Sequence, residues 1–208
     1  MCGNGARCVC RYACERGYAD DTVRVETTAG LVTGWRQGRD RFRIRLNTPT
    51  VLETERVLTL DGETYCCGYA ELGNPGIPHL TVEIPDLLLR IDDEEALGAL
   101  RMLGRKLRYH PALPKGANVN FYQVTGPQHL RQLTYERGVE DFTLACGTGA
   151  GATAAAMRLR GEVGNETLRL DFPGGELQVS LSVDENAVCD IYLTGPAVVV
   201  AEGEYIGR

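Results

Sequence analysis

The sequence lacks the features that mark several broad classes of protein. It has no run of 18 apolar residues, so no membrane-spanning helix is expected, and it starts without the basic and apolar segments of a signal peptide. A net charge of −6 argues against a nucleic-acid or membrane-surface binder, since both usually need a basic patch. We therefore expect a cytoplasmic protein that binds neither nucleic acid nor membranes.

Metal-binding spacings are also missing. No pair of Cys-x-x-Cys knuckles occurs and the three histidines are scattered, so no metal site is expected. The chain does contain eight cysteines, which stay reduced in the cytoplasm. Six of them are expected to be ordinary small apolar side chains, namely Cys8, Cys10, Cys14, Cys66, Cys67 and Cys189.

The other two cysteines belong to an internal repeat. Cys2-Gly3-Asn4-Gly5-Ala6 resembles Cys146-Gly147-Thr148-Gly149-Ala150, and each segment leads to an Arg-Gly pair at the same spacing from its cysteine. Each half then continues with alternating apolar residues around a glycine turn. The repeat predicts helices over residues 3–16 and 147–160, each followed by strands.

Other elements complete an α+β chain of two pseudo-symmetric domains. Acidic residues at the start and basic residues at the end predict a helix over residues 93–107. Further strands are predicted at residues 80–84, 119–124, 131–135 and 191–200. We expect a first domain over 1–85 and a second over 86–208, with the final strands packing back on the first.

The two halves differ in what precedes the cysteine. A long stretch back to Pro85-Asp86 belongs to the second half, whereas only Met1 precedes Cys2. If the halves are equivalent, the first domain lacks its leading strands, and its unpaired strand edges invite aggregation or a partner chain. The chain is therefore expected to be truncated at its N-terminus or completed by another polypeptide.

Cys2 and Cys146 both stand just before a predicted helix. A helix N-terminus carries unpaired N–H groups and a partial positive charge, which lower the pKa of a thiol placed there. The glycines let an anionic ligand approach the backbone closely. Two such thiols on opposite faces of one ligand suit stereoinversion, in which one thiolate removes an α-proton and the other thiol supplies one.

The residues around these cysteines carry a family resemblance. The runs Met-Cys-Gly-Asn-Gly-Ala-Arg-Cys at 1–8 and Tyr-Glu-Arg-Gly-Val-Glu-Asp-Phe-Thr-Leu-Ala-Cys-Gly-Thr-Gly-Ala at 135–150 resemble the diaminopimelate epimerase family. Support comes from residues 118–121, 173–177 and 193–197. The resemblance implies two domains, each a β-barrel-like sheet around a central helix, with the site in the cleft between them and the first domain incomplete here.

The resemblance also implies an activity. This family of isomerases interconverts LL- and meso-2,6-diaminopimelate, on the path to lysine and the bacterial cell wall, with neither pyridoxal phosphate nor metal and commonly as a homodimer. By resemblance, Cys2 and Cys146 are the catalytic pair. The substrate-binding residues it implies are Gly3, Asn4, Asn118, Glu136, Arg137, Gly147 and Thr148, while His79 and Glu136 tune the thiols.

Three departures from the family pattern leave alternatives open. Family members begin well before the first cysteine motif, in a region that holds at least two substrate-binding asparagines. Where the family often has Gly-Asn-Pro-His, this chain has Gly76-Ile77-Pro78-His79, so Asn74 takes over a substrate contact or that contact is lost. Residues 139–144 are one residue longer than usual. A related racemase, for example of histidine, and an inactive fragment are the alternatives.

Overall fold

The computed structural model describes residues 2–27, 30–185, 187–204 and 206–207. Its described helices are α1 (Gly3–Glu15), α2 (Leu87–Ile91), α3 (Glu94–Arg108) and α4 (Gly147–Arg160). The described strands are β1 (Thr22–Thr27), β2 (Gly30–Arg36), β3 (Arg41–Leu46), β4 (Pro49–Leu60), β5 (Glu63–Leu72), β6 (Ile77–Glu83), β7 (Asn118–Gly126), β8 (His129–Glu136), β9 (Asp141–Thr143), β10 (Leu168–Phe172), β11 (Gly175–Asp184) and β12 (Ala187–Pro196).

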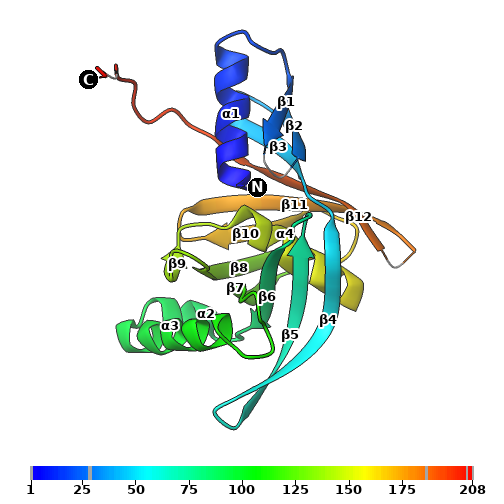
Figure 1. Cartoon of the computed structure of the whole chain (residues 1–208), viewed down its shortest axis with the longest axis vertical. Helices are drawn as coiled ribbons and strands as arrows, with labels where there is room; N and C mark the ends of the chain where they lie inside the picture. Colours follow the sequence, from blue (N-terminus) through cyan, green and yellow to red (C-terminus); the bar gives the residue numbers. More distant parts are fainter. Residues whose placement is uncertain (1, 28–29, 186, 205, 208) are drawn as a thin grey trace.

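All these strands belong to one mixed sheet (Figure 1). Its order is β1-β2-β3-β12-β11-β10-β8-β7-β6-β5-β4, with β9 beside β8. The last strand, β12, lies between β3 and β11, and it pairs antiparallel with both. A strand from the end of the chain therefore joins the sheet of the first half to the sheet of the second half.

The helices begin where the sequence predicts them. The thiol sulfurs of Cys2 and Cys146 accept hydrogen bonds from the N–H groups of Gly5 and Gly149, as N-cap side chains do. Asp93 caps α3 by accepting from the N–H of Ala96 at 2.8 Å. The three predicted helices are confirmed, with ends shifted by at most one residue, which is within the usual uncertainty of a helix end.

Helix α4 is the centre of the larger core. It packs against β4, β5, β6, β7, β11 and β12, and its residues 147–157 are all buried. Glycine and alanine fill most of these positions, which lets strands approach the helix from several sides. A Cβ at Gly151 would lie 2.8 Å from Leu46 Cδ1 and 3.1 Å from Ile191 Cγ2. The small side chains are therefore a packing requirement.

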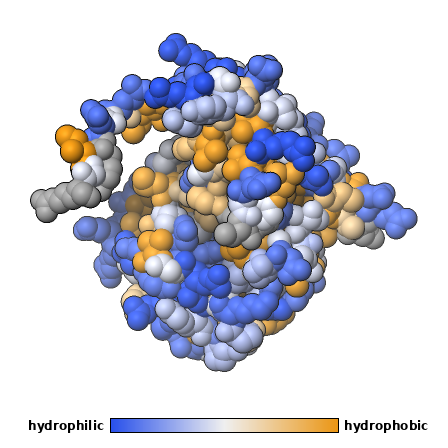
Figure 2. Space-filling model, turned by 45° about the horizontal axis from the view of Figure 1, so that its top comes forward, coloured by the Kyte–Doolittle hydropathy of each residue, from blue (hydrophilic) through white to orange (hydrophobic). Residues whose placement is uncertain are grey.

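Helix α1 has fewer partners than α4. It packs against β1, β2, β3 and β12, and its buried residues are Gly3, Ala6, Arg7 and Cys10. Beside it, residues 197–204 run away from the sheet without regular structure, and Val198–Val200 are exposed (Figure 1). In Figure 2, the face turned towards the viewer carries hydrophobic residues (orange) between hydrophilic ones (blue).

The strand packing bears on the expected domains and on one predicted strand. Strands β1–β3 pack on α1, whereas β4–β6 pack on α4. The chain therefore passes from the strands around α1 to those around α4 at residues 47–48. Because one sheet runs through both parts, the predicted division at residue 85 stays a proposal about domains. The strand predicted over 191–200 ends at Pro196. Pro196 pairs with Arg41, the first residue of β3, so β3 offers no further residue with which residues 197–200 could pair.

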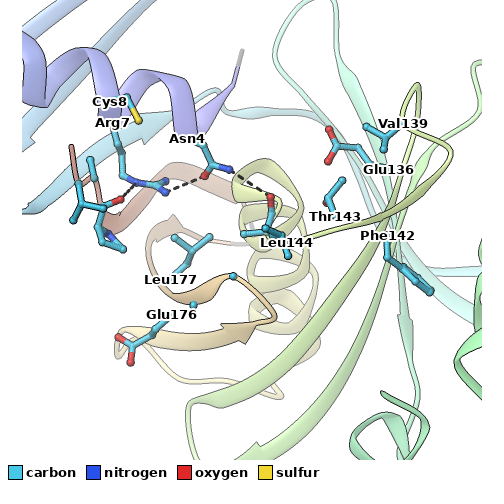
Figure 3. Close-up of a pocket in the computed structure, with 16 residues that line it drawn as sticks. Asn4, Arg7, Cys8, Glu136, Val139, Phe142, Thr143, Leu144, Glu176 and Leu177 are labelled. Atoms are coloured by element: carbon cyan, nitrogen blue, oxygen red, sulfur yellow. Dashed lines mark hydrogen bonds between the residues drawn. The ribbon is translucent and has the colours of Figure 1, made fainter. Parts of the chain in front are cut away.

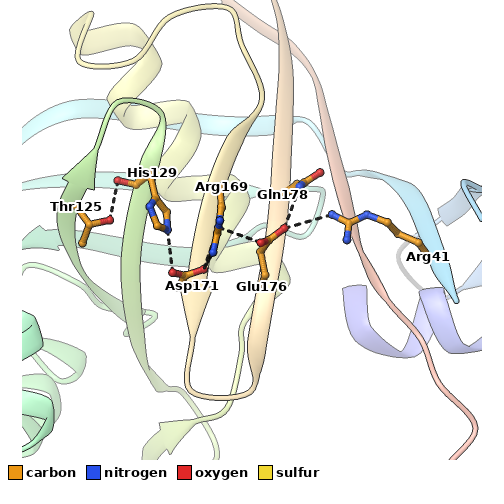
Figure 4. A network of polar contacts seen from close by, with 7 residues as sticks. All are labelled: Arg41, Thr125, His129, Arg169, Asp171, Glu176 and Gln178. Atoms are coloured by element: carbon orange, nitrogen blue, oxygen red, sulfur yellow. Dashed lines mark hydrogen bonds and ion pairs between the residues drawn. The ribbon is translucent and has the colours of Figure 1, made fainter.

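A line of polar side chains crosses the sheet (Figure 4). His129 of β8 lies 2.8 Å from Asp171 of β10, and Arg169 of β10 lies 2.9 Å from Glu176 of β11. Arg41 at the start of β3 reaches Glu176 at 3.5 Å. Such partly exposed pairs contribute about 0–1 kcal/mol each, so burial around α4 dominates the stability of the sheet.

No helix among the described residues is long and apolar enough to cross a membrane.

The core around α4 yields a stability prediction. Ile191→Ala removes a fully buried side chain that packs on the helix, so the free energy of unfolding should fall by about 2–5 kcal/mol. Val57→Ala, at a site that is 64% exposed, should change it by no more than about 0.5 kcal/mol. Urea unfolding followed by circular dichroism measures both, and equal losses would contradict this description of the core.

Candidate active site

The N-termini of α1 and α4 meet at two glycines. A Cβ on Gly147 would lie 3.7 Å from the Cα of Gly3. Leu193 of β12 packs beneath both, because its Cδ2 would lie 2.6 Å from a Cβ on Gly147 and 3.0 Å from one on Gly3. Any larger residue at Gly147 would have to displace Leu193. The two repeat motifs are thus brought together by the strand that joins the halves of the sheet.

The two cysteines occupy equivalent positions with different exposure. Each sulfur lies 3.4 Å from the backbone nitrogen three residues ahead, Gly5 for Cys2 and Gly149 for Cys146. Cys2 is exposed, whereas Cys146 is 8% exposed and has a second polar neighbour, the hydroxyl of Thr148 at 3.6 Å. The two repeated motifs therefore carry one solvent-exposed thiol, Cys2, and one buried thiol, Cys146.

The enclosed thiol corrects one sequence-based expectation. Burial raises the pKa of Cys146 to about 11, although the Gly149 N–H and the Thr148 hydroxyl favour the thiolate and lower it. Electrostatic interactions with Glu136 and with Cys2 raise the pKa of Cys146 further. The helix N-terminus acts in the expected direction, but desolvation outweighs it. Cys146 is consequently a protonated thiol at neutral pH.

A cavity of about 220 Å³ opens between the two cysteines. The residues that line it come from α1, α4 and the ends of β6, β7 and β8, which bring together all nine predicted catalytic and binding positions. They are Cys2, Gly3, Asn4, Asn118, Glu136, Arg137, Cys146, Gly147 and Thr148, with Ile77 and Ala145 in addition. Most of these groups are polar, and Ile77 is the one large apolar side chain among them.

Asn118 and Arg137 form part of the cavity wall. The backbone N–H of Arg137 donates to Asn118 Oδ1 at 2.8 Å, and its guanidinium Nη1 donates to the carbonyl of Lys115 at 3.0 Å. The amide of Asn118 is buried and donates to the carbonyl of Pro78 at 3.4 Å. A fixed amide beside an exposed guanidinium suits recognition of a carboxylate.

His79 lies behind the cavity and does not line it. Burial, together with the positive charge of Arg137, lowers the pKa of His79 to about 3, so its ring is neutral near pH 7. Its Nδ1 lies 3.3 Å from the Asn120 amide nitrogen, and its Nε2 has no hydrogen-bond partner among the described residues. Asn120 in turn packs against Gly149, whose N–H donates to Cys146.

Asn120 is a site residue to which sequence reasoning gave no role. Its Oδ1 accepts from Gln132 at 3.2 Å and from Thr134 at 3.0 Å, and it would lie 2.1 Å from a Cβ on Gly149. Asn120 therefore packs against the helix turn at Gly149, whose N–H donates to the Cys146 sulfur. Its place two residues after Asn118 on one strand puts both side chains on the same face, and that spacing was the available signal.

Asn74 is not brought to the cavity. It is exposed in the turn between β5 and β6, and it does not line the space between the cysteines. The first residue of β6, Ile77, occupies that part of the wall. The expectation that Asn74 replaces a polar contact there is therefore not supported by its position.

A larger groove of about 680 Å³ adjoins the cavity (Figure 3). It shares Asn4, Glu136 and Ala145 with the cavity and continues along α1 towards residues 174–177 and 196–198. Arg7, which sequence reasoning did not assign to the site, lines this groove and is 5% exposed. The signal for Arg7 was its helical spacing, one turn after the Gly3-Asn4 pair.

The chain is similar to known proteins over nearly its whole length. Residues 73–200 match the family model described as diaminopimelate epimerase. The chain is 39% identical to a diaminopimelate epimerase of Aquifex aeolicus over 207 residues, which are 98% of this chain and 68% of the relative. Over 215 residues it is 36% identical to one of Thioalkalivibrio sulfidiphilus, covering 98% of this chain and 72% of that protein.

Solved structures share the fold at lower identity. A hydroxyproline epimerase of Agrobacterium vitis superposes with a TM-score of 0.69 at 22% identity, covering 94% of this chain and 63% of that one. A phenazine biosynthesis protein of Bacillus anthracis gives 0.66 at 15% identity, covering 99% and 76%. These likenesses confirm the predicted α+β fold class.

The burial of His79 generates a pH prediction. Its pKa is lowered on folding from the ordinary 6.5 to about 3, so the unfolded chain takes up a proton that the folded chain refuses. The resulting stability is present above pH 6.5 and is lost as the pH falls towards 3, by up to about 1.4 kcal/mol per pH unit.

The free energy of unfolding, measured in urea from pH 4 to pH 7, tests this prediction. His79→Gln should flatten the slope by up to one proton. Ile191→Ala serves as the control, because it should lower the whole curve and keep the slope of the parent chain. An unchanged slope in His79→Gln would show that other groups cause the acid sensitivity.

Proposed function

This chain belongs to the diaminopimelate epimerase family, and we propose on that basis that it interconverts LL- and meso-2,6-diaminopimelate without a cofactor. The observation that carries the proposal is the pair of thiols at the N-termini of two abutting helices, with a polar cavity between them. This reaction provides a precursor of lysine and of peptidoglycan.

The different burial of the two thiols suggests which one acts as the acid and which as the base in one direction of the reaction. Cys146, protonated at neutral pH, donates its proton to one face of the α-carbon. The Cys2 thiolate takes the α-proton from the opposite face, and the electrons of the broken C–H bond move towards the α-carboxylate. In the reverse direction the thiols exchange roles. One proton is removed and one is added, so the substrate changes only its configuration.

The helix N-termini support the developing negative charge. The first backbone N–H groups of α1 and α4, at Gly3, Asn4, Gly147 and Thr148, have no partner inside their helices. The substrate α-carboxylate would accept hydrogen bonds from them, and both helix dipoles would stabilise the charge that builds up on it during proton transfer. Because neither Gly3 nor Gly147 has a side chain, the two helix N-termini can lie close together over Leu193.

The rest of the cavity suits a substrate with a second polar end. Arg137 and Asn118 would bind the distal carboxylate, and Glu136 adds negative charge for an ammonium group. Ile77 would contact the aliphatic carbons between the two ends. A racemase of another amino acid is the second candidate, because Ile77 stands where the resemblance led us to expect a polar contact.

We also propose a cytoplasmic location, which is supported by the need of this mechanism for two reduced thiols. The eight cysteines are free thiols in the structure, in keeping with that requirement. The homodimer implied by the family resemblance stays a prediction, which sedimentation of the intact chain would test.

Removing either thiol tests the mechanism. Cys146→Ala and Cys2→Ala should each lower epimerisation by at least about 10²–10⁴-fold, the usual contribution of a general acid or base. Incorporation of solvent deuterium at the α-carbon, followed by NMR, should fall in parallel. Cys66→Ala, an exposed position on β5, is the control and should keep the parent rate. Deuterium exchange retained by Cys146→Ala from both epimers would rule out two-thiol catalysis.

A substrate panel tests the assignment of the distal end. The parent chain should invert diaminopimelate and leave monocarboxylic amino acids unchanged in polarimetry. Arg137→Met should raise the KM for diaminopimelate about 10- to 100-fold, because hydrogen bonds to a charged group contribute about 1.5–3 kcal/mol each. Inversion of histidine or another monocarboxylic amino acid, with diaminopimelate inert, would instead favour the second candidate.

A further inference from the structure

Arg7 is a buried cation held without a carboxylate. Its side chain projects from α1 and is 5% exposed, and no acidic residue in the described part of the chain forms an ion pair with it. Its donors instead meet the carbonyl of Pro196 at 3.3 Å, the carbonyl of Gly3 at 3.4 Å and Oδ1 of Asn4 at 2.9 Å. A buried guanidinium is costly unless its donors are satisfied, so these three contacts fix its position.

The contact with Asn4 continues across the site. With its carbonyl oxygen turned to Arg7, Asn4 presents its amide N–H to the carbonyl of Ala145 at 3.4 Å. Figure 3 shows this row of contacts, from Arg7 through Asn4 to the loop before α4. Ala145 directly precedes Cys146, so the contact connects the first turn of one helix to the N-cap region of the other.

We propose that Arg7 is a positioning residue that orients the Asn4 amide and so sets the separation of Cys2 and Cys146. The row runs from Pro196 through Arg7 and Asn4 to Ala145. It fastens the end of β12, the first turn of α1 and the residue before Cys146 to one another. This inference rests on the proposed function, because the separation matters for proton transfer between two thiols.

The shape of the guanidinium is what the row requires. Its planar fork presents donors in several fixed directions at once, whereas the ammonium group of lysine is a compact charge on a flexible stem. A rival role is purely electrostatic, because the charge of Arg7 also interacts with Cys2 and Cys8. Arg7→Lys separates the two roles, since it keeps the charge and loses the fork.

Kinetics of single and double variants test the proposal. Arg7→Lys and Arg7→Met should lower kcat about 10- to 100-fold with a smaller change in KM, since a misplacement of about 1 Å costs about 10²-fold. If Arg7 acts through Asn4, the double variant Asn4→Ala/Arg7→Met should be no slower than Asn4→Ala alone. If Arg7→Met fails to fold, the double variant Asn4→Ala/Arg7→Lys is compared with Asn4→Ala in the same way.

Arg11 supplies the matched control. It lies one turn further along α1, donates to the carbonyl of Ala197 and pairs with Glu15 and Asp40, but it does not touch Asn4. Arg11→Met should therefore keep kcat within about twofold of the parent value, even where it lowers the melting temperature. An equal kcat loss in Arg11→Met and Arg7→Met would overturn the proposal in favour of a general role in stability.

A readout independent of catalysis completes the test. The side-chain amide signals of Asn4 in ¹⁵N NMR should shift in Arg7→Lys and stay unchanged in Arg11→Met. Unchanged Asn4 signals in Arg7→Lys, full kcat in that variant, or losses that multiply in the double variant would each overturn the proposal. A parent chain without epimerase activity would contradict the proposed function alone, because the amide signals would still report whether Arg7 orients Asn4.

Discussion

The contact between two helix N-termini is the constraint on which the rest of this structure depends. Gly3 and Gly147 approach each other over Leu193, and no side chain fits between them without displacing that leucine. This contact exists because β12 pairs with β3 on one side and β11 on the other. The sheet, the two central helices and the cavity therefore share one structural centre.

A repeated sequence motif has produced two chemically different thiols. Both sulfurs cap a helix in the same way, but the strands around α4 bury Cys146, while Cys2 stays exposed. Desolvation decides the difference, because it outweighs the hydrogen bonds that favour a thiolate at Cys146. Unequal burial therefore gives the two equivalent positions different surroundings, an enclosed one at Cys146 and an open one at Cys2.

The polar groups behind the cavity hold the reacting groups in place. Asn120 packs against Gly149 from the sheet side, and Arg7 and Asn4 lie on the side of α1. Arg7 and Asn120 are both buried, and each donates to a backbone carbonyl far away in the sequence, of Pro196 and of Leu80 respectively. The same burial makes the neutral ring of His79 a source of acid sensitivity.

The sequence by itself determined the helices and the identity of the cavity wall. Repeat spacing located α1 and α4, and residue types with the family resemblance selected nine of the residues that line the cavity. These are local signals, because a cap, a glycine and a helical period are written within one segment. Only the tertiary structure decided the raised pKa of Cys146, the displacement of Asn74 from the cavity, the packing of β4–β6 on α4 and the contacts of Arg7. Each of these depends on burial or on partners contributed by distant strands, and a one-dimensional pattern carries no measure of either.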